Sequence, residues 1–514
     1  MNNNLFKEFI VKTSNFFLKR KENIKAEKII FVDAAFTDEY ILYSVMKISF
    51  AIAENINAAL IVLPPLRENN RIRDIIKCFH PKKILAFKSL VVQGFIKNLL
   101  KMIYLFLTMK SGEDLLHYKD KNIPAGIHIY DEILRRDRLS SIERLTIRQK
   151  IYLIMSISFF YAMHDMFDRK NISYVVLPDN TYRDGLVYEI IKKKVIPSFT
   201  GIDINGLSMH KYQCSADYEH HCRTPDKSIV NNIVNDPKLN VRVEKYLNIR
   251  TEGKEKQHDV MRAYSTDKII IDRAWLIKYY KLDASKPLIL ITAHIFCDAP
   301  HGYPNMIFKD YEDWLVKTCV RLKNNRNVEF LIKEHPSTSL YKEEGIIEKI
   351  LDQQGISDRL LEKNINTKSL FTSIDALITC GGTSGMEFPC FGVPVLLGAK
   401  PPYSSFSYVV SPDSEAEYYK EIDNIHKYEK LEPENINLAK SVFYVIQVVM
   451  KVDKNKVGLG SQAYYLGCDF DFNLFMEEMV KDYDQGLGYN NLLEEVGALV
   501  NGSNKNIRLC AIQG

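Results

Sequence analysis

The sequence predicts an α/β protein made of two doubly wound, Rossmann-type domains that face a cleft. Short apolar runs alternate with helical segments in both halves of the chain, the pattern of parallel sheets covered by helices on both faces. A charged stretch with few strand signals, Arg223–Asp272, separates the halves. The length of 514 residues also exceeds one ordinary hydrophobic core, so two domains are expected.

The first half is expected to form a domain over residues 1–265. Its apolar runs predict the strands Lys28–Asp33, Ala58–Leu63, Lys83–Phe87, Ser173–Leu177 and Val195–Phe199. Helical periodicity between them predicts Tyr40–Ala53, Arg71–Cys78, Ile151–Arg169 and Tyr182–Lys194. Asp33 and Asp179 stand at the carboxyl ends of strands, the edge where ligands bind in open α/β sheets, so they are candidates to border the cleft.

The second half repeats the pattern and is expected to form a domain over residues 266–440. Its predicted strands are Pro287–Thr292, Val328–Ile332, Ala376–Thr379 and Val395–Leu397, and its predicted helices are Lys309–Asn324 and Tyr341–Gln354. The remaining residues, 441–514, are expected to be helices that pack back across the domains.

The composition is that of an ordinary globular protein, with 46% hydrophobic residues and a net charge of +5 that is too small to indicate nucleic acid. Nine cysteines with no C-x-x-C pair and no signal peptide predict free thiols in the cytoplasm. One cluster has the residue types of zinc ligands: His210, Cys214, His220, His221 and Cys222. Its spacing fits no standard zinc finger, so a polar loop is preferred and no metal is expected.

Two segments raise the question of a membrane. Residues 1–28 hold seven Lys or Arg against three Glu, together with several Phe, so this amphipathic helix either lies on anionic lipid or packs its Phe on the core. Val91–Met109 is apolar but is interrupted by Lys97, Asn98 and Lys101. Those polar residues argue against a spanning helix and leave an interfacial or a buried helix. We expect a cytoplasmic chain, with peripheral contact to the inner membrane left open.

The stretch from Asp375 to Lys400 predicts a strand, a glycine turn, a short helix and a second strand. Gly381, Gly382 and Gly385 allow close approach of a ligand to the backbone. Thr383 and Ser384 place hydroxyls where a helix begins, which suits a phosphate or serves only to cap the helix. Glu387, one turn later, either accepts hydrogen bonds from a ribose or is a first-turn acid favoured by the helix dipole. Together they suggest a nucleotide-sugar site.

A second motif follows the strand Val328–Ile332 directly and reads Lys333-Glu334-His335-Pro336. Both motifs come at carboxyl ends of strands and are therefore expected to face one crevice. Lys333 and His335 would neutralise a phosphate leaving group, and Pro336 would fix the turn that aims them. The plain alternative is a loop histidine that packs at a strand end.

These motifs together resemble the bacterial capsule-biosynthesis and Kdo-transferase-like glycosyltransferases of the GT-B fold. The matching residues are His335-Pro336 and Gly382-Thr383-Ser384-Gly385 with Glu387, and the loop His294–Trp314 is also similar. The resemblance covers Pro287–Lys400, about a fifth of the chain. Phe388-Pro389 departs from the family pattern, and a proline there predicts a helix that is short or starts late.

The resemblance implies a metal-independent transferase without cofactors that moves a sugar from a nucleotide-sugar donor to a surface polysaccharide, lipopolysaccharide or lipid-linked glycan. A CMP-activated Kdo or nonulosonate donor is favoured, and a UDP-sugar stays open. The second domain would bind the donor through Lys333, Glu334, Pro336, Gly381, Gly382, Thr383, Ser384, Gly385 and Glu387, and the first domain would bind the acceptor.

His335 would stabilise the departing nucleotide as a catalytic residue. An inverting transferase also needs a base for the acceptor hydroxyl, and Asp298 is the first choice because its loop should border the cleft. The other candidates are His294 and His301 in the same loop and Asp33, Asp179 or Asp184 in the first domain. Each has a structural alternative, since strand-end carboxylates often cap helices.

Three other functions remain open at this point. A teichoic-acid-type polyol-phosphate transferase shares the expected architecture and would transfer a phosphodiester group. A nucleotide-sugar epimerase would convert the donor without any acceptor. A non-catalytic scaffold for polysaccharide assembly would carry a degenerate site, which intact Lys333, His335, Thr383, Ser384 and Glu387 argue against.

Overall fold

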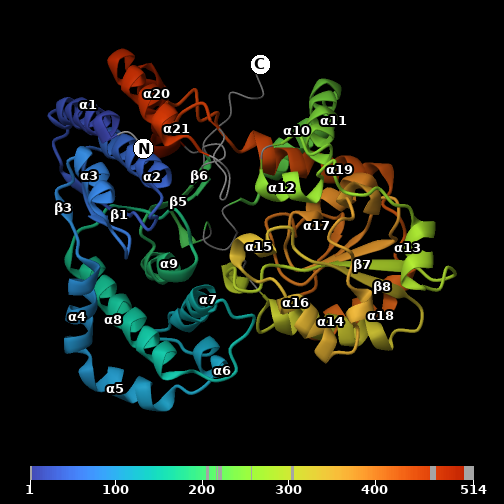
Figure 1. Ribbon diagram of the computed structural model, residues 1–514. Helices are drawn as coiled ribbons and strands as arrows, with labels where there is room; N and C mark the ends of the chain where they lie inside the picture. The colour runs from blue at the N-terminus through green and yellow to red at the C-terminus, as the bar shows by residue number, and fades with distance from the viewer. Residues whose placement is uncertain are drawn as a thin grey trace. The chain divides into compact units, whose positions relative to one another are not determined.

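The computed structural model describes residues 3–203, 208–215, 217, 223–255, 257–302, 306–462 and 470–502 (Figure 1). The chain divides into two compact units. Unit 1 comprises Met1–Tyr130, Arg144–Arg223 and Val449–Gly514, and unit 2 comprises Asp131–Glu143 and Thr224–Val448. Residues 224–265, which the sequence pattern assigns to the first domain, thus belong to unit 2, and the end of the chain belongs to unit 1.

The sheet of unit 1 has six strands in the order β3-β2-β1-β4-β5-β6. All neighbours are parallel except β5 and β6. The strands are β1 (Lys28–Asp33), β2 (Ala58–Leu63), β3 (Lys83–Ile84), β4 (Tyr174–Val176), β5 (Ser198–Asp203) and β6 (Ser208–Tyr212). This is the Rossmann order, with the chain reversing direction across the sheet between β1 and β4.

Helices cover both faces of this sheet. They are α1 (Asn3–Lys21), α2 (Glu39–Ile56), α3 (Asn70–Cys78), α4 (Phe87–Lys97), α5 (Leu99–Thr108), α6 (Gly112–Leu116), α8 (Ile147–Arg169), α9 (Tyr182–Lys194), α20 (Phe472–Gln485) and α21 (Leu487–Asn501), while α7 (Ala125–Asp137) crosses the unit boundary. Side chains of β1 alternate between the faces, as a strand requires. Ile30 and Val32 join the core of α1, α2, α20 and α21, whereas Phe31 packs on Phe167 of α8.

Unit 2 has a parallel sheet in the order β11-β10-β9-β7-β8. Its strands are β7 (Leu288–Thr292), β8 (Glu329–Lys333), β9 (Ala376–Thr379), β10 (Val395–Leu397) and β11 (Val409–Val410). A parallel bridge from Ile332 to Leu360 adds a rudimentary strand beside β8. With that bridge the order matches unit 1, and the switch in direction falls between β7 and β9. The expected fold class of two doubly wound α/β domains is therefore confirmed.

The helices of unit 2 also form two layers. They are α10 (Lys227–Val234), α11 (Pro237–Thr251), α12 (His258–Ala263), α13 (Arg273–Tyr280), α14 (Tyr311–Asn324), α15 (Thr338–Tyr341), α16 (Ile346–Gln353), α17 (Ser384–Glu387), α18 (Glu415–Asn424) and α19 (Pro433–Tyr444). Figure 1 shows α14, α16 and α18 on one face of the sheet and α17 and α19 on the other. Trp314 of α14 lies at the centre of the first layer, fully buried.

The two segments considered for membrane contact differ in the structure. In α1, Phe6, Phe9 and Phe17 are buried against α3 and α20, so the core-packing interpretation holds for this helix. Val91–Met109 forms two helices, α4 and α5, which break at Asn98. Among the described residues, no single helix meets the length and hydropathy of a membrane span, although α4 and α5 meet both together across a bend of 89°.

Candidate functional site

The carboxyl ends of three strands of unit 2 meet at one level of the sheet. Thr292 at the end of β7 is in register with Lys333 of β8 and with Thr379 of β9. A pocket that opens to solvent lies at this edge, and the space in and directly before it is about 610 Å³. Its lining includes both sequence motifs, through Lys333, Glu334, His335, Pro336, Gly382, Thr383, Ser384 and Glu387. The structure therefore brings together the residues that the two motifs predict.

Two side chains hold the glycine turn in place. The ring nitrogen Nε2 of His294 accepts the Gly381 N–H at 3.1 Å, and the Tyr403 hydroxyl donates to the Gly382 carbonyl at 2.6 Å. The Gly385 N–H donates to the same carbonyl at 3.0 Å. A Cβ at Gly385 would lie 2.3 Å from the Tyr403 hydroxyl oxygen, so the turn needs glycine there. Gly381 and Gly385 thus shape the turn and have no N–H left for a ligand.

The N–H groups of Gly382, Thr383 and Ser384 have no hydrogen-bond partner among the described residues. Neither hydroxyl caps the helix: Thr383 makes no capping bond, and Ser384 Oγ is 2.8 Å from Thr292 Oγ1. Three consecutive open N–H groups and the exposed Thr383 hydroxyl form a cradle suited to an anion. The α-helix ends at Glu387, and a 3₁₀ turn follows over Phe388–Phe391, which confirms the short helix expected from Pro389.

Lys333 lines the same pocket as this cradle. Its side chain is 8% exposed and forms no ion pair or hydrogen bond among the described residues. Burial, followed by the charge of nearby Lys268, lowers the pKa of Lys333 to about 7, and Glu334 only partly opposes them. A buried cation without a partner is costly, and an anion in the pocket would relieve that cost.

His335 and Glu334 flank Lys333 in the pocket wall. The Ser337 N–H donates to His335 Nδ1 at 3.2 Å, so the neutral ring carries its hydrogen on Nε2. The His335 carbonyl accepts the Thr338 hydroxyl at 2.7 Å and fixes the turn after β8. Glu334 forms an ion pair with Lys363 at 2.9 Å through one oxygen, while its other oxygen is buried without a hydrogen bond among the described residues.

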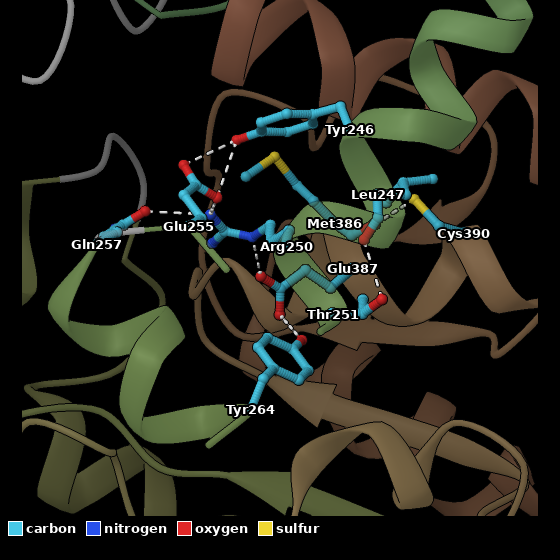
Figure 2. Close-up of polar contacts among 10 residues, drawn as sticks. All are labelled: Tyr246, Leu247, Arg250, Thr251, Glu255, Gln257, Tyr264, Met386, Glu387 and Cys390. Atoms are coloured by element: carbon cyan, nitrogen blue, oxygen red, sulfur yellow. Dashed lines mark hydrogen bonds and ion pairs between the residues drawn. The ribbon is translucent and has the colours of Figure 1, made fainter. Parts of the chain in front are cut away.

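Glu387 lines the pocket, but the protein already holds its carboxylate (Figure 2). Arg250 Nε donates to Oε1 at 2.7 Å and the Tyr264 hydroxyl donates to Oε2 at 2.7 Å. Arg250 is 1% exposed and also binds Glu255 and Gln257. A ribose hydroxyl would have to share one of these oxygens. Glu387 therefore joins α17 to the segment of α11 and α12, a role the sequence does not indicate.

Arg250 and Tyr264 line the candidate site, and sequence reasoning missed both. Arg250 begins the charged run through Asp259, which reads as a solvated connection, and no local signal shows that its guanidinium is buried. Asp259 also lines the pocket and accepts a hydrogen bond from the Ser337 hydroxyl. Thr292 could have been found, because it ends a strand whose register with the next strand is predictable.

The candidates in the loop after β7 lie in different surroundings. His294 stacks on Tyr311 with ring centroids 4.4 Å apart, and burial together with His335 lowers the pKa of His294 to about 3. A neutral ring that accepts the Gly381 N–H positions the turn and does not serve as a base. Asp298 is 3.7 Å from Arg135 and accepts the Tyr341 hydroxyl at 3.2 Å, and it does not line the pocket.

His301 forms a closed pair with Asp131. Its Nδ1 is 2.6 Å from Asp131 Oδ1, and its backbone N–H donates to Oδ2 at 3.1 Å. Burial opposes the charged ring, but Asp131, with smaller contributions from Asp310 and the Lys309 backbone, raises the pKa of His301. This pair holds the loop in place, and neither His301 nor Asp131 lines the pocket.

The acidic candidates of unit 1 form their own cluster. Asp33, Arg183 and Asp184 are all buried, and Arg183 donates to Asp33 while its Nε lies 3.6 Å from Asp184. Burial, with Asp33 as a neighbour, raises the pKa of Asp184 well above its ordinary value. Asp179 accepts the N–H of Asn180 at 2.7 Å.

The structure describes only His210 and Cys214 of the cysteine–histidine cluster, because His220, His221 and Cys222 are outside the described residues. Within the described ranges, no group of three or more His, Cys, Asp or Glu side chains is arranged to hold a metal ion.

No protein-family model matches the chain, and no curated protein matches it by sequence. Solved structures do match. A KpsC β-Kdo 2,4 transferase from Thermosulfurimonas dismutans has 12% identity and a TM-score of 0.33, over 53% of this chain and 80% of that one. The wall teichoic acid polymerase TagF has 11% identity and a TM-score of 0.24, over 95% and 99%.

A UDP-GlcNAc 2-epimerase from Neisseria meningitidis also matches, with 12% identity and a TM-score of 0.23 over 82% of this chain and 99% of that one. At these identities and TM-scores, the matches show only a general likeness of the backbone trace. The assignment of two Rossmann-type domains stands on the strand orders given above.

Proposed function

We propose that unit 2 binds the phosphate of a nucleotide-sugar donor and that the chain is a glycosyltransferase of surface-polysaccharide synthesis. One observation carries the proposal. Buried Lys333 has no partner among the described residues and lines the same pocket as the open N–H groups of Gly382, Thr383 and Ser384. A phosphate would satisfy the lysine and the N–H groups together.

The same groups suit the chemistry of sugar transfer. When the bond between the anomeric carbon and the donor phosphate breaks, negative charge grows on the departing phosphate oxygens. Fixed N–H donors and the Lys333 ammonium stabilise that charge without a change of conformation. His335, on the next turn, is the candidate to donate to the departing nucleotide through Nε2. This mode of catalysis needs no metal ion at the phosphate.

The reaction also needs a base that takes the proton from the acceptor hydroxyl. Asp298, the first choice from the sequence, does not line the pocket, whereas Asp259 does. We carry both as candidates. Asp259→Asn and Asp298→Asn, compared in one turnover assay, would tell which carboxylate the reaction needs.

Donor and acceptor follow from the sequence resemblance and are proposals. A CMP-activated Kdo or nonulosonate is favoured, a UDP-sugar is the second choice, and the acceptor is a surface or lipid-linked glycan. The products separate this function from its alternatives. An epimerase would convert donor without an acceptor, and a polyol-phosphate transferase would add the mass of a phosphodiester group to the acceptor.

The test is binding of CMP, CDP, UDP, GDP and ADP by calorimetry and by thermal shift, with and without magnesium. A nucleotide that binds the folded chain raises its melting temperature. Lys333→Met should weaken that binding by about tenfold or more, since a hydrogen bond to a charged group is lost. Lys349→Met is the matched control, because Lys349 is an exposed lysine of the same unit. Equal nucleotide affinity in the two variants would refute the assignment.

A further inference from the structure

A face of unit 1 leaves large apolar side chains in solvent. It is formed by α4, α5 and the first turns of α8, and we call it the α4–α5 face, defined by Ile96, Leu100, Tyr104, Leu107, Ile147 and Ile151. Leu100 is 83% exposed and Ile147 is 72% exposed. Single exposed apolar residues are ordinary, but a group of them on adjoining helices marks an interaction surface.

The opposite sides of these helices are firmly packed. Gly94 of α4 touches α8 so closely that a Cβ there would lie 1.8 Å from the Ser158 carbonyl oxygen. Met102 and Leu105 of α5 are buried, and the Lys150 amine donates to the Phe106 carbonyl at 3.0 Å. In Figure 1, α4 and α5 form an L outside α8. The exposed side chains therefore belong to a fixed surface.

The segment that carries the α4–α5 face is basic. From Phe87 to Gly112 the chain holds Lys88, Lys97, Lys101 and Lys110 and no Asp or Glu. Lys97 pairs with Asp165 and Lys101 with Asp120 of neighbouring segments. Lys88 and Lys110 are exposed and form no ion pair among the described residues, although the Asp114 carboxylate accepts the Lys110 backbone N–H at 2.9 Å. Exposed Arg144 lies next to Lys110 in the bridge that joins Ser111 to Arg144. An apolar centre is thus bordered by cations.

We infer that the α4–α5 face docks on the surface of an anionic lipid bilayer. Anionic headgroups complement the basic border, each Lys or Arg near the surface contributing about 1 kcal/mol. The apolar side chains would enter the boundary between headgroups and acyl chains, where amphipathic helices lie. Two helices that meet at 89° define a plane, so both can lie parallel to a flat membrane.

A second copy of the chain fits this surface less well. In a two-fold contact the same patch meets itself, so the basic segment from Phe87 to Gly112 would lie against a second copy of itself. An anionic bilayer complements the cations at the border of the face, and its flat surface suits two helices that lie in one plane. The inference rests on unit 1 alone and does not depend on the proposed donor site.

The test is co-sedimentation of the full chain with vesicles of phosphatidylcholine alone and with one quarter phosphatidylglycerol. The chain should bind the anionic vesicles and should bind them more weakly at high salt. Leu100→Gln with Leu107→Gln should lower the partition coefficient by about tenfold or more, because two apolar side chains are lost from the contact. Val11→Gln with Leu18→Gln on α1 is the matched control, since Val11 and Leu18 are also exposed apolar residues.

A second measurement reads the position of α5 directly. Tyr104→Trp should gain fluorescence that shifts to the blue on anionic vesicles and is quenched by brominated acyl chains, relative to the parent chain. The inference is overturned if the parent chain ignores anionic vesicles, or if the Leu100 and Leu107 double variant partitions like its control. It is also overturned if ultracentrifugation shows a dimer that this double variant dissociates, which would make a second copy the occupant.

Discussion

At the carboxyl edge of the unit 1 sheet, Arg183 lies beside both Asp33 and Asp184, whereas at the same edge of unit 2 Lys333 lies without an ionic partner among the described residues. Both edges belong to sheets with the same strand order, and both charges are buried. In unit 1 the buried charge of Arg183 is neutralised by carboxylates of the same unit, and such a cluster is a part of the fold. Unit 2 leaves its cation to be neutralised from outside, which is the property of a binding site.

The largest effect is expected in unit 1. Arg183→Met leaves Asp33 buried without its cation, and removal of one partner from a buried pair costs about 3–5 kcal/mol. The free energy of unfolding, measured in urea, should fall by that amount. The matched control is Arg73→Met, whose ion pair with Glu68 is at the surface and contributes little. If the two variants unfold at the same urea concentration, Arg183 does not hold the cluster together.

A smaller effect of opposite sign is expected in unit 2. Without nucleotide, Lys333→Met should be at least as stable as the parent chain, because it removes an unpaired buried charge. Its free energy of unfolding should be equal or higher by an amount on the order of 1 kcal/mol. The variant would then be no less stable while binding nucleotide less well, a combination that general damage to the fold cannot produce. A loss of stability in this variant would mean that Lys333 has an internal partner and would erase the contrast between the units.

The finest test is the dependence of stability on pH. The pKa of Lys333 is lowered from 10.5 to about 7 by burial, so between these values the unfolded chain holds a proton that the folded chain has released. Stability therefore rises with pH across that window, by at most about 1.4 kcal/mol per unit. In unit 1 the raised pKa of Asp184 works the other way and lowers stability as pH rises above 3.8. The difference between the parent and Lys333→Met curves isolates the lysine, and a flat difference would count against its low pKa.

Local patterns were enough to predict much of the fold. The bounds of β1, β2, β9 and α9 agree with expectation because apolar runs, glycines and prolines mark them within the sequence itself. The same holds for the pocket motifs around Lys333 and Ser384, since strand ends of a parallel sheet meet at one edge.

The rest depends on partners distant in the sequence. The Phe residues of α1 and the apolar residues of α5 look alike in composition. Phe9 is buried because α2 and α20 pack against it, and α20 lies near the end of the chain. In the same way, the role of Glu387 depends on Arg250, which lies in a run of charges that reads as solvated. The two members of such a pair are so far apart in the sequence that no local pattern shows their contact.

The contact between Arg250 and Glu387 has a consequence for natural variation. The two residues are 137 positions apart, yet the loss of either one alone would strand a charge in the interior. Relatives of this chain should therefore exchange the two positions together, to an uncharged pair or not at all. Correlated change at these two positions, more than any motif near either one, would identify the chains that share this pocket.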